Sequence, residues 1–307
     1  MPILKKKTEN VPPSRWELTY ADAAGKSTDF YVNAHCYELD EFERSKNINH
    51  TDTTFVFHFD SFDRKKIIRN PTRLDALWRE QSGVVLAAGD TRGYLEINAS
   101  EVSEVALSDV PGQFSCFWAL NDDHLYACGG FEPFFYYRYK RKWFAVPLPE
   151  NCPPLWSIAG LNEKEIYVVG GEGIVLLFNG KTISRIECPT DRMLTSVAVL
   201  NDRYVCIGGY EGILIIGNRN GWRFVPTGSE EPLLKIATYG GKVFFGAEDG
   251  LWSFDGRNEP VHIAEHRTRW MSALEDGLLF GNGQAYLYVN NEIHPIDNML
   301  NYPEETR

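Results

Sequence analysis

Acidic side chains recur at one place in a repeated phrase of this 307-residue chain, at or just after a glycine that ends a strand-forming run. The carboxylates are Asp90, Glu132, Glu172, Glu211, Glu248 and Asp249. Acidic residues suit turns and stay solvated there, which explains them without any function. Gathered on one surface, they would instead attract a basic protein, in keeping with a net charge of -11. We expect the hairpin that carries Glu172 to be the centre of any such contact.

Histidines near carboxylates or near one another offer a second kind of chemistry, the binding of a metal ion. His58 and Asp60 lie on one face of an expected strand, with Asp63 nearby, and imidazole with carboxylate can ligate a metal. His262 and His266 have the i, i+4 spacing of ligands on a helix, but their surroundings are strand-forming. The glutamate that directly follows the first histidine in zinc proteases is missing, since Ile263 stands there. We interpret both sets as surface residues and predict no metal site.

His35 and Cys36 raise the possibility of a base beside a nucleophile, which requires that both side chains point into one pocket. Adjacent residues of a strand face opposite ways, so this pair does not meet the requirement. No glycine-rich phosphate loop opening a helix stands out in the sequence. The sequence therefore predicts no catalytic residue and no cofactor site.

The glycines that end the strand-forming runs set the period of the chain. They are Gly89, Gly129, Gly170, Gly208, Gly246 and Gly281, separated by 40, 41, 38, 38 and 35 residues. A period near forty residues in such sequence is typical of a propeller blade, a four-stranded sheet set radially about an axis. Residues 155–186 show the unit as four short apolar runs with turns such as Glu172-Gly173 between them. Glycine at the second place of a two-residue hairpin permits the positive φ that the hairpin twist requires.

The region before residue 74 is less regular than the repeats. Residues 16–20, 29–32 and 54–59 read as strands, and a charged segment between them suits a loop or short helix. These strands fit one more, degenerate blade, which gives an all-β propeller of seven blades. The alternative is a six-bladed ring flanked by the N-terminal strands as an added layer.

Each blade of a propeller needs its neighbours to bury its faces, so we expect one domain over residues 1–307. The expected parts are an irregular N-terminal blade and closure region in 1–73, six blade repeats in 74–296 and a tail in 297–307. We expect the ring to close by pairing an N-terminal strand with the last blade, near residues 292–296, because closure removes exposed edges.

Paired glycines give the repeats a resemblance to known propeller families. Gly129-Gly130, Gly170-Gly171 and Gly208-Gly209 resemble the paired glycines of kelch repeats. Residues 166–180 are similar to blades of the photosystem-assembly-factor and sialidase-like-repeat group. The Ser-x-Asp-x-Gly-x-Thr-Trp box of sialidases is absent, as is the Trp-Asp dipeptide of WD40 blades. The resemblance implies a fold over residues 74–296, and a fold alone does not set a function.

Two further groups of residues could bind ligands. Trp78, Trp118, Trp156 and Trp270 open four repeats and could stack on a sugar or peptide, although regular repetition favours packing between blades. Residues 138–143 alternate cations with aromatics, which could contact phosphates, but they read better as an outer strand with alternate residues solvated. Because the chain is acidic, a nucleic-acid partner is disfavoured.

Export and membrane signals do not appear in the sequence. There is no apolar stretch of membrane-spanning length, and residues 1–7 lack the apolar core of a secretion signal. We therefore expect a cytoplasmic protein without a membrane partner, whose six cysteines are reduced thiols.

The features combined favour a non-enzymatic propeller that binds another protein. One specific expectation is a bacterial cytosolic immunity or inhibitor protein, whose acidic face binds a basic toxin or effector domain. An assembly chaperone or scaffold is an alternative, and so is a hydrolase of lactonase or glycosidase type that uses the axial channel.

Overall fold

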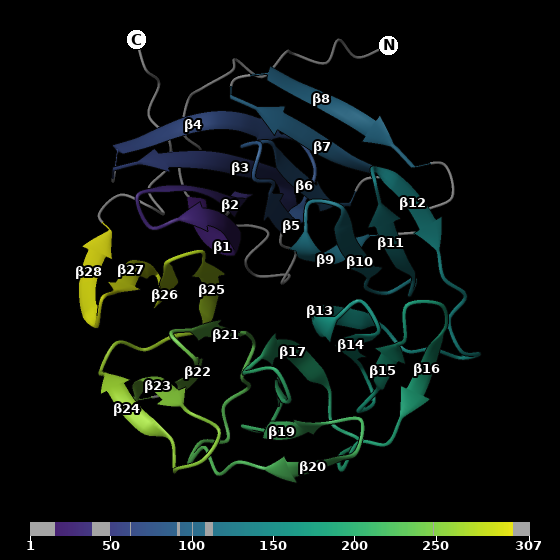
Figure 1. Cartoon of the computed structure of the whole chain (residues 1–307). Coiled ribbons are helices and arrows are strands. Elements are labelled where there is room, and N and C mark those ends of the chain that lie inside the picture. The colour runs from purple at the N-terminus through teal and green to yellow at the C-terminus, as the bar shows by residue number, and fades with distance from the viewer. Residues whose placement is uncertain are drawn as a thin grey trace.

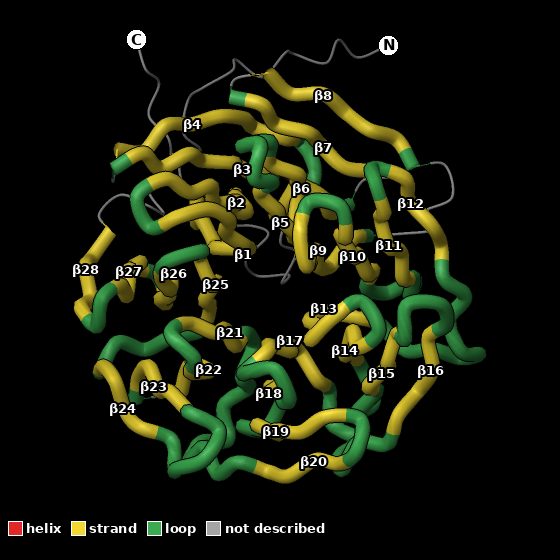
Figure 2. Tube along the Cα trace, in the orientation of Figure 1, coloured by secondary structure: helices red, strands yellow, loops and turns green. Residues whose placement is uncertain are grey.

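The computed structural model describes residues 16–38, 50–61, 63–90, 93–99, 101–107, 113–247 and 249–296. The described residues form twenty-eight β-strands and no helix (Figure 2), and so contain no helix long and apolar enough to span a bilayer. The strands make seven four-stranded antiparallel sheets, each built from four consecutive strands in chain order. Figure 1 shows the sheets arranged around a central axis. The fold is a seven-bladed β-propeller, which confirms the favoured prediction and rules out the six-bladed alternative.

The blades are numbered here in chain order. Blade 1 contains β1 (Trp16–Lys26), β2 (Asp29–Glu38), β3 (His50–Asp60) and β4 (Asp63–Asn70). Blade 2 contains β5 (Leu74–Arg79), β6 (Val85–Gly89), β7 (Gly93–Asn98) and β8 (Glu101–Ala106). Blade 3 contains β9 (Phe114–Asn121), β10 (His124–Gly129), β11 (Phe135–Tyr139) and β12 (Lys142–Ala145). Blade 4 contains β13 (Leu155–Asn162), β14 (Glu165–Gly170), β15 (Val175–Phe178) and β16 (Ile183–Ile186).

The remaining three blades follow the same plan. Blade 5 contains β17 (Leu194–Val199), β18 (Val205–Gly209), β19 (Leu214–Asn218) and β20 (Gly221–Phe224). Blade 6 contains β21 (Ile236–Tyr239), β22 (Lys242–Ala247), β23 (Gly250–Phe254) and β24 (Val261–Ala264). Blade 7 contains β25 (Trp270–Leu274), β26 (Gly277–Asn282), β27 (Gln284–Val289) and β28 (Glu292–Ile296).

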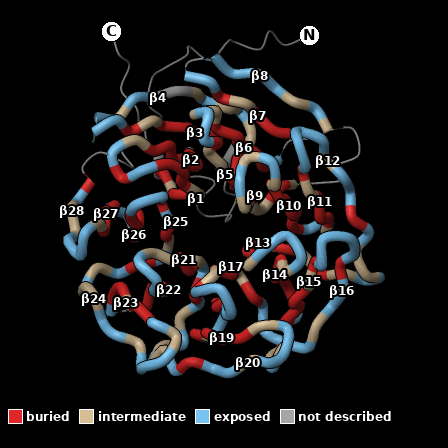
Figure 3. The backbone as a smooth tube through the Cα atoms, in the orientation of Figure 1, coloured by how far each residue is buried: buried red, intermediate tan, exposed pale blue. Residues whose placement is uncertain are grey.

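How deeply a strand is buried depends on its place within the blade. The first strand of each blade lies nearest the axis and the fourth lies at the outer rim (Figure 1). Second strands such as β6 and β18 are buried along their whole length, because a neighbouring blade covers each face. Outer strands such as β8 and β20 are largely exposed, and Figure 3 shows the buried segments inside the ring. The core is therefore a set of apolar layers between blades, as a propeller requires.

Two-residue hairpins join the second and third strands of blades 4 and 5. Glu172 and Gly173 have φ values of 52° and 64°, and Glu211 and Gly212 have 56° and 65°. In blade 4 the N–H of Ile174 bonds to the carbonyl of Gly171 at 3.0 Å, which closes the turn. The prediction of hairpins with positive φ at these dipeptides is confirmed.

The glycines chosen from the sequence to mark the repeat are not all structurally equivalent. Gly170 pairs with Leu155, the first residue of its inner strand, whereas Gly208 pairs with Ser196 and Gly209 pairs with Leu194. The residue equivalent to Gly170 in blade 5 is therefore Gly209. An adjacent pair of glycines offers two registers, and only the pairing of β17 with β18 decides between them.

The expected closure of the ring by an N-terminal strand is wrong. The last blade is complete with β25 to β28, while β1 pairs with β2 in the first blade. Side chains join the two blades instead: Ser272 Oγ donates to Asp22 Oδ1 at 2.7 Å, and Ser27 bonds to Asp276 through both its N–H and its hydroxyl. The Tyr20 ring also stacks on Trp270 with centroids 4.1 Å apart.

Small polar side chains join the inner strands of neighbouring blades in a regular way. The Oγ of Ser157 accepts the N–H of Val197 at 3.1 Å, and the Oγ of Ser196 accepts the N–H of Ile236 at 3.1 Å. Two more contacts repeat this between neighbouring blades: Asp22 Oδ2 accepts the N–H of Leu77, and Ser272 Oγ accepts that of Ala23. We call these four acceptors the junction residues. They satisfy inner-strand N–H groups that have no partner strand on the axial side.

Removing a junction residue should weaken the ring. We expect Ser196→Ala to lower the free energy of unfolding by about 1 kcal/mol, because it leaves the N–H of Ile236 without this acceptor. Urea unfolding followed by circular dichroism measures the change. Ser184→Ala on the exposed face of β16 is the control, with an expected change below about 0.5 kcal/mol. Equal losses for the two variants would contradict a special role for the junction.

Candidate functional site: the hairpin face

In blades 2 to 5 the hairpins between second and third strands lie on one face together with the connections that enter the first strands. A hydrogen bond ties each of these four hairpins to the connection of its own blade. The bonds run from Asp90 N to Arg73 O at 2.8 Å, from Gly130 N to Gln113 O at 3.1 Å, from Gly171 N to Pro154 O at 2.9 Å and from Tyr210 N to Met193 O at 3.0 Å. We call this surface the hairpin face. The hairpins between first and second strands lie on the opposite face.

The acidic residues singled out from the sequence fall on these hairpins, where the structure describes them. Asp90, Glu132, Glu172, Glu211 and Asp249 are exposed, and Glu248 lies outside the described residues. Two of them have partners: Glu211 Oε2 lies 3.0 Å from Arg192 Nε, and Asp249 Oδ1 accepts the indole N–H of Trp252 at 2.8 Å. Of the other three, Asp90 interacts with the charges of Asp75, Arg73 and His35. Glu132 and Glu172 have no ion-pair or hydrogen-bond partner among the described residues.

Backbone conformation argues against a simple turn preference for two of these glutamates. Glu172 and Glu211 adopt positive φ, where a side chain with a Cβ is disfavoured. Asn, Asp or Gly would fit the first place of such a hairpin better than Glu. Both blades nevertheless hold an exposed glutamate there. Turn preference therefore does not account for a glutamate at these two positions.

Exposed apolar side chains lie on the same face, which the sequence reasoning missed. Phe131, in the hairpin of blade 3, is 77% exposed and meets the Trp156 ring edge-on with centroids 5.7 Å apart. Met193, Tyr210 and Leu234 are also exposed. We call these three the apolar strip, because backbone bonds join their segments: Tyr210 N to Met193 O, and Leu233 N to Gly209 O at 2.9 Å. For Phe131 and Tyr210 the signal in the sequence was a large apolar residue directly after a pair of glycines.

A cavity of about 730 Å³ occupies the axial channel and is lined by residues of all seven blades. Lys235 projects from the inner part of blade 6 into this region. Burial lowers the pKa of Lys235, but the carboxylates of Asp22 and Asp75 outweigh that effect and raise the pKa above its usual value. Burial also raises the pKa of the Cys116 thiol. At neutral pH these two groups stay protonated, so neither acts as a base or as a thiolate nucleophile.

A buried histidine lies near the hairpin end of the channel, between blades 1 and 2. His35 Nε2 lies 2.8 Å from the carbonyl of Leu74 and 3.5 Å from Asp75 Oδ1. Asp75 also contacts Arg73 Nε at 2.9 Å and Gln113 Nε2 at 2.6 Å. Burial lowers the pKa of His35, with Asp75 opposing, while burial and the Asp75 charge raise the pKa of Asp90. The cluster holds three blades together, and Asp90 is electrostatically part of it.

The other residues considered for metal or catalytic chemistry do not converge. His58 pairs with Asp29 at 2.7 Å, while His262 lies 3.1 Å from the carbonyl of Asp249 and His266 stacks on a tyrosine. His35 and Cys36 point to different surroundings, since Cys36 belongs to the apolar core of blades 1 and 7. Among the described residues no three His, Cys, Asp or Glu side chains are placed to hold a metal. All six cysteines lie in the described part and none forms a disulfide.

The tryptophans pack between blades rather than forming a binding ring. Trp78 and Trp118 belong to apolar clusters that join neighbouring blades, and Trp270 stacks on Tyr20. The interpretation of residues 138–143 needs a correction at Arg138, which is buried instead of solvated. Its Nη2 lies 2.6 Å from Glu80 Oε1, with both side chains 1% exposed. A buried charge needs such a partner, and Glu80 comes from the neighbouring blade.

Comparison with known proteins adds information on the fold. No protein-family model matches the chain, and no curated protein matches its sequence. The chain is similar in structure to the WD40 β-propeller domain of Doa1, with a TM-score of 0.64, 8% identity and coverage of 92% of this chain and 96% of that one. It is also similar to streptogramin B lyase (TM-score 0.60, 13% identity, 76% and 83% coverage). A third similar structure is the RRP9 WD40 repeats (TM-score 0.53, 12% identity, 77% and 91% coverage).

The likeness is one of fold. At these identities it carries no activity or partner across to this chain. The likeness to WD40 propellers exists without the Trp-Asp dipeptide that names such repeats. The resemblance to kelch and photosystem-assembly-factor blades stays a prediction from sequence.

The buried histidine makes stability depend on pH. Because the pKa of folded His35 lies below its unfolded value near 6.5, the unfolded chain binds the proton more readily. Stability is therefore full above that value and falls as the pH drops below it, by up to about 1.4 kcal/mol per pH unit. His35→Gln keeps a donor for the Leu74 carbonyl but cannot titrate in this range. Urea unfolding from pH 8 to 5 should show a smaller slope for this variant, and parallel curves would contradict the assignment.

The positive φ of Glu172 and Glu211 should lower the free energy of unfolding, as we expect if these residues serve binding. We expect Glu172→Asn to raise the free energy of unfolding by about 1 kcal/mol, because Asn tolerates positive φ better than Glu. Glu132→Asn on the same face is the matched control, since its φ is not positive, and it should leave stability unchanged. Thermal and urea unfolding measure both variants. A loss of stability in Glu172→Asn would show that the glutamate is there for the fold.

Proposed function

We propose that this chain is a non-enzymatic propeller whose hairpin face binds a basic protein. One observation supports this above others: exposed apolar side chains and exposed carboxylates share the same rim. Phe131 lies beside Glu132, and Tyr210 lies beside Glu211. Aromatic anchors surrounded by polar groups are the usual composition of a protein interface.

The charge of the chain determines the kind of partner. A net charge of -11 and the carboxylates of Glu132 and Glu172, which are unpaired within the described part of the chain, favour a partner with a basic surface, which long-range attraction would also steer. The specific form that we propose is a cytosolic immunity protein, in which the bound protein is a basic toxin or effector domain. Blocking the active surface of such a domain needs no chemistry from the propeller itself.

Site-specific crosslinking tests the proposed face. A photoreactive phenylalanine analogue at position 131 should capture one stoichiometric partner in the native cell, and the same analogue at Tyr204 on the opposite face should not. Capture from position 204 alone, or from neither position, would refute the proposal. If the captured protein is toxic on its own and harmless when co-expressed with this chain, the immunity role is supported; a harmless partner refutes that specific form.

Charge reversal tests the electrostatic part separately. We expect Glu132→Lys with Glu172→Lys to weaken binding of the captured partner at least tenfold at low salt and to reduce its dependence on salt, because the attraction is lost. Asp123→Lys with Asp202→Lys changes the same charge on the opposite face and is the control. Affinity and salt dependence can be measured by surface plasmon resonance. Equal effects of the two double variants would remove the acidic face from the proposal.

A further inference from the structure

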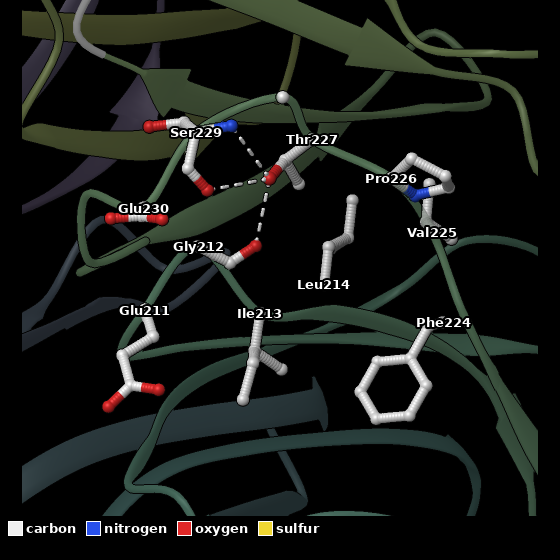
Figure 4. A pocket seen from close by; sticks show the side chains of 11 residues that line it. Glu211, Gly212, Ile213, Leu214, Phe224, Val225, Pro226, Thr227, Ser229 and Glu230 are labelled. Atoms are coloured by element: carbon white, nitrogen blue, oxygen red, sulfur yellow. Dashed lines mark hydrogen bonds between the residues drawn. The ribbon is translucent and has the colours of Figure 1, made fainter.

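Blade 5 carries a groove of about 430 Å³ at the outer end of its hairpin. Figure 4 shows Ile213, Leu214 and Phe224 with Val225 and Pro226 along one side of it, and Glu211 and Glu230 at the other end. The apolar walls come from the hairpin and from the end of β20, and the connection into blade 6 closes the groove. The volume is in the range of sites that hold one ligand group or a large side chain.

Contacts within the groove show that its shape is built in. Thr227 Oγ1 donates to the carbonyl of Gly212 at 2.9 Å and accepts the N–H of Ser229 at 3.4 Å. The connection lies so close to the hairpin that a Cβ on Gly212 would collide with the carbonyl of Ser229. Val225 is buried and its N–H bonds to the carbonyl of Leu214 at 2.8 Å. A ligand would therefore meet a preformed groove and would not have to order it.

The two ends of the groove differ in exposure and in charge. Phe224 is 52% exposed at the apolar end, although it is a large apolar side chain on an outer strand. At the other end Glu230 is exposed and has no ion-pair or hydrogen-bond partner among the described residues, while Glu211 is paired with Arg192. One end therefore suits an apolar side chain, and the other suits a cation.

The groove is continuous with the proposed interface. The hairpin of blade 5 carries Tyr210 of the apolar strip, and the next residues, Glu211 to Ile213, line the groove. A protein that covers the strip needs to extend only past this hairpin to reach Phe224. The groove thus lies where a flexible segment of the same partner would be held.

We propose that the blade-5 groove binds a short segment of the partner in which an aliphatic or aromatic residue lies next to a Lys or Arg. The apolar residue packs against Phe224 and Ile213, and the basic residue pairs with Glu230. This inference rests on the proposed protein-binding function, and it names the chemistry of the segment that the partner supplies. A large apolar anchor in a preformed pocket is the typical centre of such an interface.

A displayed library of random twelve-residue peptides, selected on the full chain, tests the inference without knowledge of the partner. We expect enriched peptides to place an apolar residue within two positions of Lys or Arg. Synthetic copies should lose at least tenfold in affinity, by fluorescence polarisation, toward Phe224→Glu and toward Glu230→Lys. Val261→Glu and Glu259→Lys are matched controls, because they make the same changes at exposed positions of blade 6 and should leave binding unchanged.

The outcomes separate this inference from the proposed function. Enrichment of peptides without basic residues, binding insensitive to both groove variants, or no enrichment overturns the groove assignment. If crosslinking at position 131 still captures a partner in that case, the hairpin face stands and only the groove falls. If peptides bind the groove but position 131 captures nothing, the proposed use of the hairpin face falls instead. Unchanged circular dichroism and melting temperatures confirm that each variant is folded.

Discussion

The inner strand of a propeller blade has one edge paired within its own sheet and one edge facing the axis, where its N–H groups still need acceptors. Short side chains of the preceding blade meet this need here, through Asp22, Ser157, Ser196 and Ser272. Each bond satisfies a donor and also fixes one sheet against the next. In blades 2, 5 and 6 the hairpin is therefore carried on a sheet whose inner edge is fixed to the preceding blade.

Lys235 shows what happens when the junction position does not hold an acceptor. Lys235 directly precedes Ile236, just as Ser196 directly precedes Val197. The N–H groups of Ile236 and Val197 each donate to a serine side chain of the preceding blade. An ammonium group can only donate, so it cannot do for blade 7 what Ser196 does for blade 6. The carboxylates of Asp22 and Asp75 keep it charged within the channel.

Much of the fold could be predicted from the sequence, because strand period and hairpin dipeptides are local. The turn at Glu172-Gly173 needs only its own residues to be recognised. The register of Gly208 and Gly209 and the ring closure at Ser272 could not be predicted, since both depend on which distant strand lies alongside. The burial of Arg138 likewise follows from Glu80, fifty-eight residues away. For the site, the sequence indicated the carboxylates but not the exposed Phe131 beside them, because exposure depends on the finished surface.

Glu172 and Glu211 are two of the places where local preference and observed residue disagree, and Ala99, Lys140 and Arg141 also adopt positive φ. In a sequence that specifies one fold, the local preferences of the residues normally agree with the overall structure. The exceptions concentrate where function requires them. Both glutamates adopt positive φ in otherwise regular hairpins and reach solvent on the face that carries the apolar strip. Asp in the same turn would keep the charge at lower conformational cost, so charge alone does not explain a glutamate. In Glu211 the longer side chain reaches Arg192, 3.0 Å away. In Glu172 it brings the carboxylate further from the backbone, as the proposed contact with a second protein requires.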